Sequence, residues 1–98
     1  MKKIVLKFTC HSDLIIVPDS IAQNIHSIRM EFDKWLYDKS NNHDYWVYIN
    51  GKKKAVSFDS NAFVDYLNNI HLVNNKEKSY IIQKKIERIT SEIPILFF

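Results

Sequence analysis

The sequence predicts one α+β domain over residues 1–98, built as a two-layer sandwich: a mainly antiparallel sheet of three or four strands with helices on one face. Three observations predict this class. Apolar residues recur at helical spacing after Pro18, and the dipeptide Asn50-Gly51 separates two strand-like runs. A composition of 46% hydrophobic and 26% charged residues suits a globular chain with one modest core. The expected element order is β-α-β-β-α-α-β.

The first two elements are a strand and a long helix. Partial alternation from Lys2 to Thr9 predicts a strand with one buried face. Pro18 is typical of a helix entrance, and Ser20 with Gln23 has the spacing of a capping box. Apolar residues then follow at helical intervals: Ile21, Ile25, Ile28, Phe32 and Trp35 or Leu36. We therefore expect a helix from Asp19 to about Lys39, ended by the segment SNNHD at 40–44.

The next segment, YWVYINGKKKAVSF, predicts a hairpin. Asn50 and Gly51 both tolerate the positive φ angles of a type I′ turn. With a two-residue loop the opposed pairs are Ile49–Lys52, Tyr48–Lys53, Trp46–Ala55 and Tyr45–Val56. One face then carries the expected core residues Tyr45, Val47, Ile49, Val56 and Phe58, and the other carries Trp46, Tyr48, Lys53, Ala55 and Ser57. A bulge would shift this register by one residue and reverse part of the assignment.

Two helices and a closing strand are expected after the hairpin. Asp59 or Ser60 is a suitable N-cap; with Asp59 as the cap, Phe58 and Phe63 have hydrophobic-staple spacing. The inward residues of this helix are expected to be Phe63, Leu67 and Ile70. After a loop at NNKEK (74–78), isoleucines at 82, 86, 89 and 93 predict a third helix, which Pro94 ends before the strand ILFF.

Enzyme chemistry finds little support in the composition. A single glycine argues against a phosphate-cradling loop, and the four histidines, His11, His26, His43 and His71, show no metal-ligand spacing. Cys10 and His11 are neighbours at the expected end of a strand, where alternation would point their side chains to opposite faces. We predict no catalytic residue, no cofactor and no metal. A minimal nuclease whose histidine and lysine meet only in space stays as an alternative.

Charge and cysteine content indicate which partners and which cellular compartment to expect. The net charge is +3, with the excess in residues 76–88 and a net negative charge in residues 13–44. This mild asymmetry falls short of the dense basic face of a nucleic-acid-binding protein. The lone Cys10 cannot form an internal disulfide, and no apolar run approaches the roughly 20 residues that span a bilayer. We expect a cytoplasmic protein with no membrane partner.

Two binding roles compete for the hairpin. Trp46 and Tyr48 beside Lys53, flanked by Lys52 and Lys54, combine stacking rings with cations, as in single-stranded nucleic-acid binders. The same residues suit a protein interface, where tryptophan, tyrosine and basic residues are frequent anchors. A second, partly polar stripe at His26, Met30, Asp33 and Tyr37 follows the first helix. Protein docking is the preferred interpretation because the net charge is modest, and nucleic-acid binding is the alternative.

The segments VPDSIAQNIHSIRMEFDKWLYD and YWVYINGKKKAVSFDSNAFVDYL give the chain a resemblance to a family. A short domain with one long capped helix, a tight aromatic hairpin and no catalytic set resembles the small immunity proteins of bacterial contact-dependent growth inhibition and related polymorphic toxin systems. The resemblance implies a cytosolic protein that binds one toxin domain, often a nuclease, and blocks its active site. It carries over no functional residues, because the family has no diagnostic motif.

Two sets of charged residues are alternative candidates for the contact surface. Immunity proteins that block nucleases are often acidic, whereas this chain is basic overall. If the partner is a nuclease, the acidic residues of the first helix and the loop after it are the better candidates: Glu31, Asp33, Asp38 and Asp44, with Tyr37 beside them. If the partner is acidic, the hairpin lysines 52–54 take that role.

Overall fold

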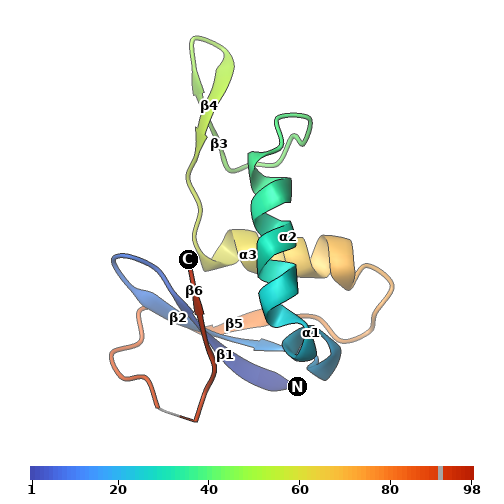
Figure 1. The fold of residues 1–98 in the computed structure, drawn as a ribbon, viewed down its shortest axis with the longest axis vertical. Helices are drawn as coiled ribbons and strands as arrows, with labels where there is room; N and C mark the ends of the chain where they lie inside the picture. Colours follow the sequence, from blue (N-terminus) through green and yellow to red (C-terminus); the bar gives the residue numbers. More distant parts are fainter. Residues whose placement is uncertain (91) are drawn as a thin grey trace.

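A four-stranded mixed sheet, helices on one of its faces and a separate two-stranded hairpin make up the fold (Figure 1), and this confirms the predicted α+β class. The computed structural model describes residues 1–90 and 92–98. The strands are β1 (Lys2–Lys7), β2 (Ser12–Val17), β3 (Trp46–Ile49), β4 (Lys52–Val56), β5 (Tyr80–Gln83) and β6 (Ile95–Phe97). The helices are α1 (Asp19–Gln23), α2 (Ile25–Tyr37), α3 (Ser60–Tyr66) and the π-helical turn η1 (Leu67–His71).

The main sheet has the strand order β5-β2-β1-β6. β1 and β2 form an antiparallel hairpin, β5 pairs antiparallel with β2, and β6 pairs parallel with β1. The strand at 12–17 is absent from the predicted element order. Its run Leu14-Ile15-Ile16-Val17 is continuously apolar because both faces of β2 are covered: Ile15 and Val17 lie in the core, and Leu14 and Ile16 on the opposite face are half-buried. The predicted hairpin forms, but as a sheet of its own, β3-β4.

The hydrophobic core lies between the sheet and the helices. Alternate residues of the strands point into it: Ile4 and Leu6 from β1, Ile15 and Val17 from β2, and Leu96 from β6. Phe32 of α2 is fully buried among them, in edge-to-face contact with Phe63 of α3. Figure 1 shows α2 rising from the sheet toward the base of the β3–β4 hairpin, so the helix connects the two sheets.

The predicted helix from Asp19 to Lys39 is divided. Asn24, with φ −117° and ψ 23°, separates α1 from α2. The expected capping box of Ser20 and Gln23 does not form, because α1 already begins at Asp19 with Pro18 in the N-cap position. None of the helices within the described residues is long and apolar enough to cross a membrane.

Asp59 caps α3 as predicted: its Oδ1 accepts a hydrogen bond from the Asn61 N–H at 2.9 Å. The prediction that Ile70 faces inward is wrong. The chain widens into η1 at Leu67, which changes the direction of the side chains that follow, and Ile70 is 50% exposed. Phe63 and Leu67 face inward as predicted, and Leu72 fills the core in place of Ile70.

The predicted third helix over the isoleucines at 82–93 is also wrong, in the part of that range outside Ser91, which is not among the described residues. Tyr80–Gln83 forms β5, and the chain after it is irregular. Isoleucine is β-branched and suits a strand, and the pairing of β5 with β2 overrides the helical spacing. Lys85, at φ 55°, then turns the chain.

A buried carboxylate holds this turn in place. Asp13 of β2 is fully buried and accepts hydrogen bonds from the Lys85 N–H at 2.9 Å and from the Ser60 hydroxyl at 2.5 Å. His11 Nε2 lies 3.4 Å from the same carboxylate. Asp13 therefore joins the sheet, the start of α3 and the segment after β5.

Candidate partner-binding surface

The hairpin arm, defined as residues 46–56, projects from the end of the molecule opposite the main sheet (Figure 1). Its turn is of the expected type, because Asn50 and Gly51 have φ angles of 53° and 75°. The first two opposed pairs also match the prediction: Ile49–Lys52 and Tyr48–Lys53.

A bulge then changes the register. The next pairs are Val47–Ala55 and Trp46–Val56, so Lys54 is the extra residue on β4. The predicted pairs Trp46–Ala55 and Tyr45–Val56 are therefore wrong. Directly opposed residues share a face, so Trp46, Tyr48, Lys53 and Val56 lie on one face of the arm. Val47, Ile49, Lys52 and Ala55 lie on the other.

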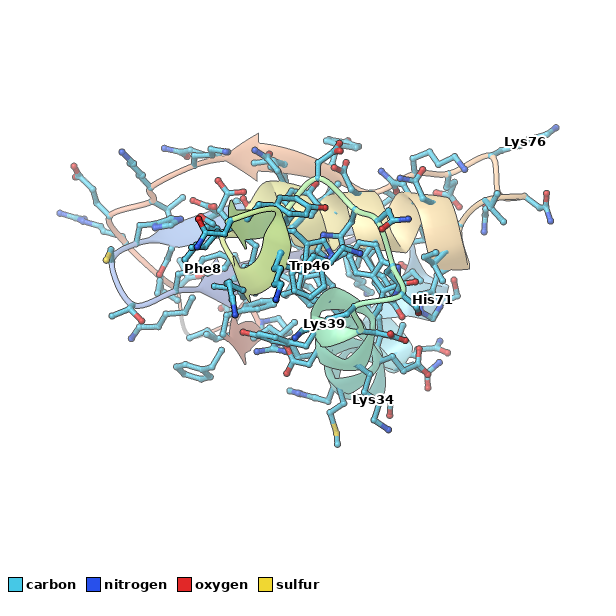
Figure 2. The ribbon with its side chains drawn as sticks, turned by 90° about the horizontal axis from the view of Figure 1, so that it is seen from above. Phe8, Lys34, Lys39, Trp46, His71 and Lys76 are labelled. Atoms are coloured by element: carbon cyan, nitrogen blue, oxygen red, sulfur yellow. The ribbon has the colours of Figure 1, made fainter. Side chains whose placement is uncertain are left out.

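Trp46 faces the body of the molecule, contrary to the prediction that it is exposed. Its side chain is 9% exposed, its Nε1–H donates to the Asn41 carbonyl at 2.7 Å, and its ring stacks on His43. In Figure 2, which looks down on the arm, Trp46 lies toward the interior, whereas Lys34 and Lys76 extend from the periphery. An indole with a satisfied N–H is a large apolar group that this small domain buries.

Lys53 is engaged within the molecule too. Its Nζ donates to the carbonyls of Lys39 at 2.6 Å and Asn41 at 3.0 Å and to Oδ1 of Asn42 at 2.6 Å. These three bonds use all three N–H donors of the ammonium group. The ammonium also lies 5.4 Å from the centre of the Trp46 ring. Lys53 therefore fixes the arm to the loop after α2 and has no free donor for a partner.

His43 completes the base of the arm. Its Nε2 donates to the Leu36 carbonyl at 2.8 Å, and its Nδ1 accepts from the Tyr45 N–H at 3.1 Å. These two bonds assign the neutral tautomer with the proton on Nε2. The ring also packs against Trp35, with centroids 4.7 Å apart. The segment SNNHD, predicted only as a helix breaker, thus holds the base of the arm in place through hydrogen bonds and ring packing.

The outer face of the arm, defined as Val47, Ile49, Lys52 and Ala55, points to solvent. Val47 is 40% exposed and Ile49 is 53% exposed, although both were predicted to lie in the core. The pairing register alone does not determine which face of the hairpin turns toward the body of the molecule. Trp46 and Lys53 donate hydrogen bonds to the loop at 39–43, so their face is the inner one. Tyr48 is 55% exposed, as predicted, and Lys52 and Lys54 are also exposed.

The acidic candidates do not form one surface. Glu31 and Asp33 lie two residues apart on α2 and point to different sides of it. Asp33 pairs with Arg29, and Glu31 pairs with Nε2 of His71 at 3.1 Å. Asp38 follows the end of α2 and accepts from the backbone N–H and hydroxyl of Ser40, which lower the pKa of its carboxyl. Asp44 is exposed on the loop before β3.

The outer stripe of α2 is free of helix packing. His26, Met30 and Tyr37 are all exposed, and Asp33 is half-exposed. The stripe was predicted as a second candidate contact surface, and the exposure of its side chains is consistent with that role. It forms a second solvent-facing surface, on the same helix that carries the arm.

Metal-ligand spacing and the neighbours Cys10 and His11 were the enzyme-like features considered from the sequence. Within 1–90 and 92–98, no three histidine, cysteine, aspartate or glutamate side chains are placed to hold a metal ion. Cys10 is exposed, while His11 turns toward Asp13. Burial raises the pKa of Tyr45, and a hydrogen bond to the Asp65 carboxylate raises it further, so this phenol stays protonated.

Comparison of the chain with protein families, with curated proteins and with solved structures found no match.

Proposed function

We propose that this chain is a non-enzymatic immunity protein that neutralises a bacterial toxin domain in the cytoplasm by covering its active site. The observation that carries the proposal is the outer face of the arm. Val47 and Ile49 stand in solvent on a projecting hairpin whose base is fastened by Trp46 and Lys53. Exposed apolar side chains on a fixed support are typical of protein-binding surfaces.

The arm is well prepared for docking. Its inner face is already ordered by hydrogen bonds to the loop at 39–43, so binding costs little conformational entropy there. Tyr48 at the tip supplies an aromatic anchor, and Lys52 and Lys54 form a basic rim. The corrected set of candidate contacts is Val47, Tyr48, Ile49, Lys52 and Lys54, in place of Trp46 and Lys53.

Two of the acidic candidates, Asp38 and Asp44, give the proposal a second support. Asp38 and Asp44 flank the loop on which the arm is seated, and Tyr37 ends α2 next to them. If the arm binds a basic nuclease domain, Asp38 and Asp44 would lie next to that domain at the base of the arm, where opposite charges attract. Glu31 is less suited, because it is paired with His71 on another part of α2.

The nucleic-acid alternative loses its main argument. A stacking platform needs exposed rings with free cations beside them, whereas Trp46 is buried and Lys53 is bonded to three acceptors. Tyr48 is the remaining ring of that set.

The test begins with the genes adjacent to the one that encodes this chain. The C-terminal domain of a neighbouring large secreted protein is expressed in the cytoplasm of a host, with and without the chain. The proposal expects growth to stop without the chain and to resume with it, and the two purified proteins to form a stable complex. Unchanged toxicity, or tight oligonucleotide binding that weakens steeply with salt, would count against it.

A further inference from the structure

We infer that the partner adds an extended, acidic strand to the free edge of β3, and this inference rests on the proposed function. The two edges of the arm differ. β4 carries three consecutive lysines, Lys52 to Lys54, and a bulge at Lys54, and both features discourage pairing with another strand. β3, with the sequence WVYI, carries neither a charge nor a proline, and the bulged residue lies on its neighbour.

Backbone groups on β3 are available for such pairing. In a two-residue hairpin the residues next to the turn, Ile49 and Lys52, exchange hydrogen bonds. The following pair, Tyr48 and Lys53, is then a non-bonded pair, and the N–H and C=O of Tyr48 point away from β4. Among the described residues, no backbone hydrogen bond outside the arm reaches Val47, Tyr48 or Ile49. The edge of β3 near the tip is therefore unpaired.

Charge indicates what kind of strand the edge accepts. Every charged side chain of the arm is a lysine, and Lys52 and Lys54 are exposed. A strand added beside β3 would lie near these ammonium groups, so carboxylates on it are favoured. Val47 and Ile49 on the outer face call for apolar residues at alternate positions of the same strand. Lys52 lies on that same face, so the expected occupant is a segment of the partner that carries β-branched and acidic residues together on one face.

A second copy of this chain fits the edge less well. Two copies would bring two lysine-bearing arms together with no carboxylate in either arm to compensate. A four-residue strand also buries far less than the roughly 1,200 Å² of total surface that a stable dimer needs. Neither objection applies to an acidic strand of a partner, because its charge is opposite to that of the lysines and the partner adds contacts beyond the edge.

The test uses a synthetic seven-residue peptide, with both ends blocked, that carries glutamate and valine together on one face and threonine on the other. The inference expects it to bind the wild-type chain with a dissociation constant below about 1 mM and to slow hydrogen exchange at the Tyr48 amide. A matched peptide with lysine in place of glutamate is expected to bind at least about tenfold more weakly. Tyr48→Pro removes the outward N–H without touching a bond to β4, and it should abolish binding.

Several results would overturn the inference: no binding of the glutamate peptide at about 1 mM, equal binding of both peptides, or binding that leaves the Tyr48 amide unprotected. A wild-type dimer that Tyr48→Pro dissociates would place a second copy on the edge and would also overturn it. If Tyr48→Pro fails to fold, hydrogen exchange on the wild type decides alone. These measurements use the chain by itself, so their failure is distinct from a failure to neutralise the toxin.

Discussion

The rings of His43 and Trp46 stack with their planes 8° apart and their centroids 5.0 Å apart. His43 is itself fixed by two backbone hydrogen bonds, to Leu36 and from Tyr45. The stack therefore couples the orientation of the arm to that of α2. It explains why Trp46 belongs to the inner face and leaves Val47 and Ile49 to the solvent.

Replacing Trp46 should damage the fold. Trp46→Ala removes a buried ring and the bond from its Nε1 to the Asn41 carbonyl, so we expect a loss of about 3–4 kcal/mol in the free energy of unfolding. Tyr48→Ala, on the same face but exposed, should cost less than about 1 kcal/mol. Urea denaturation of the two variants measures both values, and equal losses would show that the indole is not buried.

The two neighbouring lysines of β4 should behave differently. Lys53→Met keeps most of the side-chain volume but removes three hydrogen bonds to the loop at 39–42, so we expect a loss of about 1–2 kcal/mol. Lys54→Met changes an exposed bulge residue and should alter stability by less than about 0.5 kcal/mol. Thermal unfolding of the two variants in the same buffer makes the comparison. Equal melting temperatures of the two variants would show that the hydrogen bonds of Lys53 do not fix the arm to this loop.

The buried carboxylate of Asp13 is expected to be essential for the segment after β5. Asp13→Asn removes the charge and replaces one acceptor oxygen with a donor, so the side chain can no longer accept from both the Lys85 N–H and the Ser60 hydroxyl; this should cost about 2–4 kcal/mol. Asp33→Asn, which weakens an ion pair between the mostly buried Arg29 and the half-exposed Asp33, should cost less, about 1 kcal/mol. Chemical denaturation compares them, and amide exchange at Lys85 shows whether the turn has opened. A tolerant Asp13→Asn would mean that this network adds nothing to stability.

Tyr45 gives a prediction about pH. Its pKa in the folded chain lies above the ordinary value, first because of burial and then because of the hydrogen bond to Asp65. A raised pKa means that the stabilisation is complete below the tyrosine pKa of the unfolded chain, about 10, and declines as the pH rises past it. The stability advantage of the wild type over Tyr45→Phe should thus be constant up to about pH 9 and shrink above about pH 10. An advantage that stays constant to higher pH would exclude the buried phenol as its source.

The sequence was sufficient for the features set by local chemistry. Asn50 and Gly51 fixed the turn type, Asp59 fixed the start of α3, and Pro18 marked the entrance to α1. Each of these depends on one or two residues and their own backbone angles. The α+β class followed from the same signals.

Features set by distant partners could not be predicted in this way. The isoleucines from Ile82 onward have helical spacing, but pairing with β2 makes the first of them part of a strand. The outer and inner faces of the arm were reversed for a similar reason. A bulge at Lys54 and the acceptors of the loop at 39–42 decide the faces, and no local pattern indicates that Lys53 would bond to them.

The most direct test of the account compares two exposed isoleucines. Ile49 on the outer face of the arm and Ile70 on η1 are 53% and 50% exposed, so Ile49→Asp and Ile70→Asp should both fold with little loss of stability. The measurement is the survival of cells that carry each variant together with the neighbouring toxin domain. Ile49→Asp should fail to protect the cells, and Ile70→Asp should protect them like the wild type; full protection by both variants would rule out the arm as the docking surface.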